Sequence, residues 1–278
     1  MEHFIGHGDH WDAFGVNSEQ IAEIIQKTIQ NGSVLREYVY KFPESNEATV
    51  PLIYPENNSV QVCSLHLSNS KEQSVMLKSI FPFFEGYKNS VVIHGKYSWG
   101  NDLEGEIEVM AEGITDGREN ISFFSPFFIQ NFEDIDTGVK VDVYLAGLAY
   151  SIEPVLDIQF KMDSGRYYEM ELENFLAENP TKSKDDFPYV LCNTDGLVAL
   201  FSTNYYSEFQ YRGKILELNY EYFENKKFAK VKICILRDYG DDKLFIYIYI
   251  LEEKFNDYIP KIGDNIQGVV WLLGYTKK

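Results

Sequence analysis

The spacing of hydrophobic residues differs between the N-terminal part of the chain and the rest. In residues 17–31 the isoleucines recur at spacings of three and four, which predicts an amphipathic helix. Asn17 is placed to cap the first turn of this helix, with Gln20 three positions later as its reciprocal partner. From about residue 89 onward, apolar and polar residues instead alternate in short stretches, which predicts a series of β-strands.

The clearest alternation lies in residues 103–112. One face of this predicted strand carries apolar or small side chains, and the other face carries carboxylates. The apolar face consists of Leu103, Gly105, Ile107, Val109 and Ala111, and the acidic face consists of Glu104, Glu106, Glu108 and Glu112. A strand of this kind packs its apolar face on a core, so we expect the glutamates to face solvent.

A second series of predicted strands begins near residue 207 and repeats the layout of the first. Each series opens on a strand that contains Gly-Lys, at Gly95 and Gly213, and continues with an alternating strand and an aromatic-rich strand. Each then has a short connection that ends in Gly138 or Gly263, before a long apolar strand. The two series share a pattern and not an amino-acid sequence, as a structural repeat would.

A strand series of this length, with glycine in its first strand and a connection before its last, resembles an OB-type barrel. The resemblance covers residues 89–153 and 207–276. It implies small closed sheets that are filled by apolar side chains. The apolar run in residues 264–275 would then be the strand that closes the second barrel, and an antiparallel β-sandwich is the alternative architecture.

The predicted fold class is therefore mostly β, with α+β structure at the N-terminus and two OB-like antiparallel barrels. A chain of 278 residues is long enough for more than one core. The expected regions are a small α+β region at 1–88, a strongly acidic OB-like unit at 89–153, a connecting segment of strands and loops at 154–206, and a near-neutral OB-like unit at 207–278.

The composition agrees with a packed β protein and adds a strong negative charge. Hydrophobic residues make up 45% of the chain and aromatic residues 15%, an enrichment that favours strands. The formal net charge of -18 repels nucleic acid and anionic lipid and attracts basic partners. The charge is uneven, because residues 207–278 hold 12 basic and 11 acidic side chains.

The cysteines and the apolar runs bear on the location of the protein. Cys63, Cys192 and Cys234 are far apart and form no CxxC pair, which is typical of buried, reduced thiols. The first residues lack the basic and apolar regions of a signal peptide, and no apolar run approaches the roughly 20 residues that span a bilayer. We therefore expect a cytoplasmic location and no membrane association.

The acidic face of residues 103–112 is the first candidate binding surface. Glu104, Glu106, Glu108 and Glu112 would present a row of negative charge to a basic surface on another protein. The same row would repel a phosphate backbone. The alternative is that these glutamates form only a solvated strand face.

The near-neutral C-terminal series contains a different candidate surface. Lys230 and Lys232 alternate on one predicted strand, and Tyr247 and Tyr249 alternate on the next. Lysines beside tyrosines are what the binding of a single-stranded nucleic acid on a barrel face requires. The alternative is a half-buried strand pair whose lysines extend to solvent, and the negative charge of the whole chain disfavours nucleic acid.

Three of the five histidines lie within eight residues near the chain start. His3, His7 and His10 stand there with Asp9 and Asp12, and imidazoles with carboxylates suit a divalent metal such as zinc or nickel. No HExxH motif accompanies them. The alternative is a loosely packed chain start with incidental histidines, and no other cofactor is expected.

No motif in the sequence identifies a reaction, because a GxSxG elbow, a P-loop and a Cys–His pairing are all absent. The leading hypothesis is a non-enzymatic binding protein whose acidic face takes a basic protein partner, as a bacterial immunity- or inhibitor-like protein would. One alternative is binding of single-stranded nucleic acid or an oligosaccharide on the C-terminal barrel face. The other is a metal-dependent enzyme that uses the N-terminal histidines.

Overall fold

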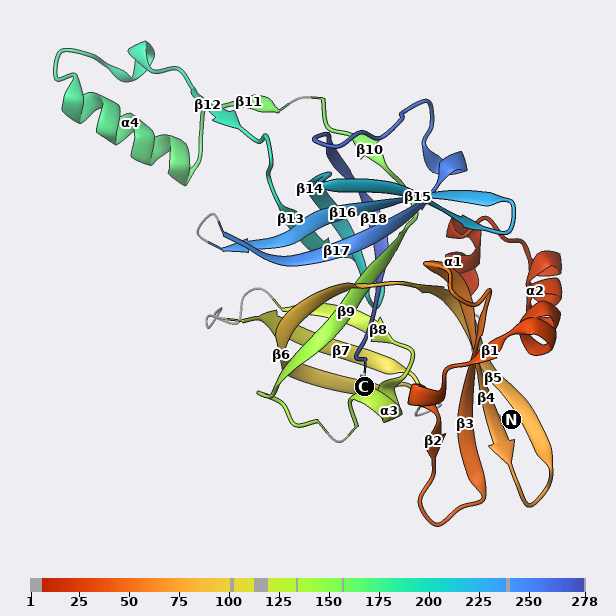
Figure 1. Ribbon diagram of the computed structural model, residues 1–278. Coiled ribbons are helices and arrows are strands. Elements are labelled where there is room, and N and C mark those ends of the chain that lie inside the picture. Colours follow the sequence, from red (N-terminus) through yellow and green to blue (C-terminus); the bar gives the residue numbers. More distant parts are fainter. Residues whose placement is uncertain are drawn as a thin grey trace. The chain divides into compact units, whose positions relative to one another are not determined.

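The computed structural model describes residues 7–100, 103–112, 120–133, 135–156, 158–238 and 241–277. The protein is mostly β with few helices, and five of its strands close into a barrel (Figure 1). The predicted mostly-β class is thereby confirmed. The chain divides into two compact units, Met1–Pro154 with Val198–Lys278, and Val155–Leu197.

The larger unit begins with two helices and a five-stranded sheet. Helix α2 starts as predicted: the Gln20 backbone N–H donates to Asn17 Oδ1, and the Asn17 backbone N–H donates to Gln20 Oε1, both at 3.0 Å. The sheet order is β1-β3-β4-β5, with β2 also paired to β3. The elements are α1 (Gly8–Ala13), α2 (Ser18–Asn31), β1 (Ser33–Val34), the 3-10 helix η1 (Arg36–Tyr38), β2 (Tyr40–Lys41), β3 (Glu47–Tyr54), β4 (Val60–Asn69) and β5 (Ser74–Phe84).

The closed barrel takes four strands from the middle of the chain and one from its C-terminal part. Its order is β6-β7-β8-β18-β9, and β9 returns to β6. All neighbours are antiparallel except β8 and β18, which run parallel through Phe124 and Leu273. The elements are β6 (Tyr87–Ser98), β7 (Gly105–Ala111), β8 (Ile121–Ser125), α3 (Phe128–Asn131), β9 (Lys140–Ala149) and β18 (Asn265–Tyr275).

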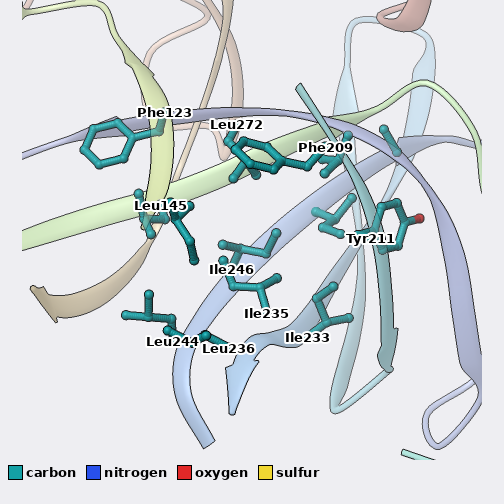
Figure 2. Close-up of a cluster of buried hydrophobic side chains, with 14 of the residues drawn as sticks. Phe123, Leu145, Phe209, Tyr211, Ile233, Ile235, Leu236, Leu244, Ile246 and Leu272 are labelled. Carbon is teal, nitrogen blue, oxygen red and sulfur yellow. The ribbon is translucent and has the colours of Figure 1, made fainter. Parts of the chain in front are cut away.

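The other strands of this unit extend the barrel sheet from two of its members. Strand β17 pairs in parallel with β9 and continues to β16 and β15, whereas β14 pairs with β18 and continues to β13. One buried cluster runs from the barrel interior to these added strands, and Figure 2 shows Leu145 and Leu272 of the barrel among Phe209 and Ile246 of the added strands. The added elements are β10 (Glu153–Pro154), β13 (Ala199–Ser202), β14 (Glu208–Lys214), β15 (Glu217–Phe223), β16 (Lys226–Asp238), β17 (Asp241–Leu251) and the 3-10 helix η3 (Glu252–Lys254).

This arrangement differs from the two separate barrels that were expected in residues 89–153 and 207–278. Strand β18 closes the barrel that β6 to β9 begin, so the two stretches share one sheet. The physical reason is that β8 and β9 each present an open edge, and a strand from elsewhere in the chain must pair with both. Local alternation of side chains carries no information about which strand does so.

The N-terminal sheet packs against the outside of the barrel. A second buried cluster joins Phe81 of β5 to Phe124 of β8 and to Trp271 and Leu273 of β18. Leu272, between those two residues of β18, belongs to the interior cluster instead. Both faces of β18 are therefore buried from Val270 onward, which explains why this part of the strand is apolar and does not alternate.

The smaller unit, Val155–Leu197, is built from one helix and a two-stranded sheet. Tyr168 is the one buried side chain in its described part, and the Tyr168 hydroxyl donates to the Phe187 carbonyl oxygen at 2.8 Å. In the described part of the chain, no helix has both the length and the apolar character needed to cross a membrane. The elements are β11 (Gln159–Met162), α4 (Arg166–Glu178), the 3-10 helix η2 (Lys184–Asp186) and β12 (Val190–Asn193).

Because β18 closes the barrel, truncation of a buried side chain on this strand should strongly lower the stability of the protein. Leu272 is fully buried in the interior cluster, so Leu272→Ala should lower the free energy of unfolding by about 2–5 kcal/mol. Gln267→Ala, at an exposed position of the same strand, should change it by less than about 0.5 kcal/mol. Chemical denaturation measures both, and equal effects from the two substitutions would contradict the closing role.

Candidate functional site

The four glutamates on and beside β7 lie on the face away from the barrel interior, as the alternation predicts, but most of them do not face solvent. Ile107 belongs to the interior cluster, so the acidic face of the strand points away from it. The expectation of a solvated ladder is wrong for Glu104, which is fully buried, and for Glu106, which is 8% exposed. Glu108 is half-buried, and only Glu112 is exposed.

Glu104 is covered because it joins the chain start and the N-terminal sheet to the barrel. Glu104 Oε1 accepts a hydrogen bond from Ser79 Oγ at 2.6 Å and lies 3.0 Å from His7 Nε2. The His7 ring packs edge-on against Phe124, with ring centroids 4.9 Å apart. A buried network of this kind fixes the register of the elements it connects, so Glu104 is a structural residue and not a contact for a partner.

Glu106 and Glu108 line an open pocket on the outer side of β6, β7 and β8. Its volume is about 840 Å³, which is in the range of sites for small molecules and peptide side chains. Three aromatic side chains and two carboxylates give it an acidic, partly apolar wall. We call it the acidic pocket; its lining residues are Tyr97, Ser98, Trp99, Gly100, Glu106, Glu108, Ser122 and Tyr206.

The register of the barrel sheet brings the lining residues together. Tyr97 of β6 lies directly across from Glu106 of β7, and Ser122 of β8 lies directly across from Glu108. Such cross-strand pairs have Cβ atoms about 5 Å apart on one face of the sheet. The pocket is therefore built on three paired strands, which hold its carboxylates in fixed positions.

A glycine allows Tyr97 to fold over Glu108. The Tyr97 hydroxyl donates to Glu108 Oε2 at 3.5 Å, and Asn120 Nδ2 donates to Glu108 Oε1 at 2.9 Å. A Cβ atom at Gly95, which faces Glu108 beside an irregularity in the β6–β7 register, would come within 2.8 Å of Glu108 Oε2 and 3.0 Å of the Tyr97 hydroxyl. A side chain at position 95 would therefore clash with this wall of the pocket, which explains the glycine there.

Glu106 has no hydrogen bond or ion pair among the residues that the structure describes, although it is 8% exposed. Most of the Glu106 residue is removed from solvent, but its carboxylate oxygens are not among the fully buried atoms, so water rather than any described residue satisfies them in the free protein. Because Glu106 lines the acidic pocket, the missing donor can be supplied by a ligand in that pocket.

The third aromatic residue, Tyr206, comes from the turn between β13 and β14. Backbone hydrogen bonds hold this turn: the Thr203 N–H donates to the Glu208 carbonyl at 3.0 Å, and the Leu272 N–H of β18 donates to the Ser207 carbonyl at 2.7 Å. Ser207 has a φ of 55°, in the left-handed region that non-glycine residues seldom occupy. Strained turns of this kind concentrate at binding sites, and this one leaves the Tyr206 side chain 78% exposed.

Part of this site can be predicted from the sequence. The sequence singled out Glu106 and Glu108, but as members of an exposed ladder. Tyr97 and Trp99 alternate just before a predicted turn, which is a usable signal for two side chains on one face. Tyr206 lies in the expected connecting segment, 100 positions from Glu106, and nothing local in the sequence brings the two together.

The second candidate surface is assembled but already has internal partners. Register places Lys230 opposite Tyr249 and Lys232 opposite Tyr247, as neighbouring lysines and tyrosines require. Lys230 Nζ bonds to Glu85 Oε2 at 2.5 Å, and Lys232 Nζ bonds to Glu217 Oε1 at 3.0 Å. Tyr249 is fully buried. The four residues thus join the sheet to its neighbours, and their charges are balanced.

The N-terminal histidines also have partners inside the fold. His3 lies outside the described residues, and His7 is bonded to Glu104. His10 Nδ1 shares a hydrogen bond of 2.6 Å with the Tyr150 hydroxyl, and its ring stacks on Trp271 with centroids 3.9 Å apart. Among the described side chains, no group of three or more His, Cys, Asp or Glu is arranged to hold a metal ion.

Comparison with protein-family models, with curated proteins and with solved structures finds no significant match. The protein is therefore characterised by its architecture, a mostly-β fold with a closed five-stranded barrel, and by the acidic pocket on the outer side of that barrel.

Burial of His10 predicts a pH-dependent stability. Burial, with repulsion from His7 as the smaller cause, lowers the pKa of His10 from 6.5 to about 3, so the folded protein favours the neutral ring. The contribution of His10 to stability is therefore complete above pH 6.5 and is lost as the pH falls toward 3, by up to about 1.4 kcal/mol per pH unit. Denaturation of the wild type and His10→Gln from pH 7 to pH 4 should show the shallower dependence in the variant, and parallel curves would contradict the assignment.

The unpaired carboxylate predicts that a neutral side chain stabilises the free protein. Glu106→Gln should raise the free energy of unfolding by up to about 1 kcal/mol, because it removes a largely buried charge that has no donor in the described part of the protein. Glu112→Gln is the matched control on the same acidic face; it breaks an exposed ion pair with Lys140 and should lower stability by no more than about 1 kcal/mol. A clear loss of stability in Glu106→Gln would show that Glu106 has a structural partner.

Proposed function

We propose that this protein is a binding protein whose acidic pocket takes a positively charged group of a basic protein partner. The observation that carries the proposal is Glu106, a carboxylate that is 8% exposed, lines the pocket and has no partner among the described residues. A cationic donor in the pocket would satisfy this carboxylate with a charge-assisted hydrogen bond.

Charge and surroundings both support a cationic ligand. Glu108 lies two positions along the same strand and adds a second carboxylate to the wall. Tyr97, Trp99 and Tyr206 add aromatic rings, whose faces attract cations. The net charge of -18 would steer a basic partner toward the protein from a distance.

The proposal narrows the acidic face that the sequence suggested. Glu104 is excluded as a contact because it is fully buried, and Glu112 lies outside the pocket and is paired with Lys140. Glu106 and Glu108 remain as the contact residues. Nucleic acid is not favoured, because Lys230 and Lys232 are neutralised by Glu85 and Glu217.

The test uses a fluorescein-labelled peptide, Gly-Gly-Arg-Gly-Lys-Gly-Gly, and fluorescence anisotropy at low ionic strength. Wild-type protein should bind it, and Glu106→Gln should weaken the binding by about 30-fold or more, because a buried ion pair is lost. Circular dichroism checks that the variant is folded.

Glu112→Gln distinguishes the pocket from general attraction to an acidic surface. This variant loses the same charge at the residue that follows β7, outside the pocket, so its affinity should stay within about twofold of wild type. Equal losses in Glu106→Gln and Glu112→Gln, or no binding by the wild type, would reject the acidic pocket as the site.

A further inference from the structure

We infer that the acidic pocket is selective for a guanidinium group, and that its occupant is an arginine side chain of a peptide or protein. The inference rests on the proposed function and specifies the chemical class of the ligand. It follows from the donors that Glu106 lacks, the spacing of Glu106 and Glu108, and the aromatic wall.

The ligand must bring N–H donors to Glu106. Glu106 is buried beside the pocket and accepts no hydrogen bond from any described residue. A quaternary ammonium group brings charge but no donor, so it would displace water from the carboxylate without replacing the hydrogen bonds of that water. Guanidinium and primary ammonium groups both bring donors, and they are the remaining classes.

The spacing of the Glu106 and Glu108 carboxylates favours a guanidinium group over an ammonium group. Glu106 and Glu108 are separated by two positions on one face of β7, which is roughly 7 Å along a strand. A guanidinium group presents five N–H donors in one plane and can direct them to two acceptors, whereas an ammonium group is a compact point charge. Glu108 already accepts from Asn120 and Tyr97, but an ionised carboxylate has about four acceptor positions, so capacity remains.

The aromatic residues that line the pocket also favour a guanidinium group. Tyr97 is 57% exposed and Tyr206 is 78% exposed, so both rings offer accessible faces, and Trp99 completes the wall. A planar guanidinium stacks on such rings and is less strongly hydrated than an ammonium group, which makes its transfer into the pocket less unfavourable.

The pocket favours an arginine side chain within a polypeptide over free arginine. Free arginine carries an α-carboxylate that Glu106 and Glu108 would repel and an α-ammonium group that they would attract, so its backbone charges add little. Within a peptide both charges are absent, and a pocket of about 840 Å³ has room for residues that flank the arginine and add contacts that the free amino acid lacks. An arginine within a polypeptide is therefore the expected occupant.

The experiment compares three labelled peptides, Gly-Gly-Xaa-Gly-Gly with a blocked C-terminus, in which Xaa is arginine, lysine or trimethyllysine. Anisotropy titrations should rank arginine above lysine by about tenfold, with trimethyllysine weakest. Unlabelled free arginine, as a competitor, should be weaker than the unlabelled arginine peptide.

Two neighbouring tyrosines supply a matched pair of variants. Tyr206→Ala removes a ring of the wall and should weaken the arginine peptide roughly three- to tenfold. Tyr205→Ala, next to it, 70% exposed and outside the pocket, should leave the affinity unchanged. Because both side chains are exposed, neither substitution should affect folding.

The outcomes separate this inference from the proposed function. Lysine binding as tightly as arginine, or trimethyllysine binding most tightly, would overturn guanidinium selectivity and leave a cation-binding pocket in place. Free arginine competing as well as the peptide would overturn the polypeptide source. No binding by any of the three peptides would overturn both proposals.

Discussion

The structure depends on burial of both faces of strand β18 over residues 270–275. Leu272 points into the barrel, while Trp271 and Leu273 point out of it and pack against the N-terminal sheet. The same strand supplies the backbone groups that close the barrel between β8 and β9 and pairs with β14 in the added sheet. Hydrophobic burial and edge pairing thus act together in one segment, which contacts the barrel, its cover and the added strands.

The cover on the barrel also creates the candidate site. The N-terminal segment buries Glu104 through His7 and Ser79, and the acidic face of β7 then becomes more accessible toward Glu108. Glu106 lies between these two environments, with its carboxylate near water but without a donor from the described residues. A group held in this way costs stability in the free protein and gains a favourable interaction when a cation binds. That exchange is the physical basis of the proposed binding activity.

Two polar clusters outside the pocket differ from Glu106, because their polar groups are paired or kept neutral within the protein. Lys230 and Glu85 form an ion pair between β16 and the N-terminal part of the unit, and Tyr249 is buried beneath them. His10 is held neutral between Tyr150 and Trp271. Paired or neutral groups of this kind stabilise contacts between elements and offer little to a ligand, whereas the unpaired Glu106 does.

The sequence by itself determined the periodic features. The capped helix at Ser18–Asn31, the β class, and the opposite faces of Ile107 and Glu106 on one strand all follow from local spacing and capping chemistry, and the structure has each of them. Only the tertiary structure decided that β18 closes the barrel of β6 to β9, that the acidic ladder is mostly covered, and that Tyr206 joins Tyr97 and Trp99 in one pocket. The reason is that local spacing fixes which side of an element a residue occupies, while pairing between distant strands fixes what that side contacts.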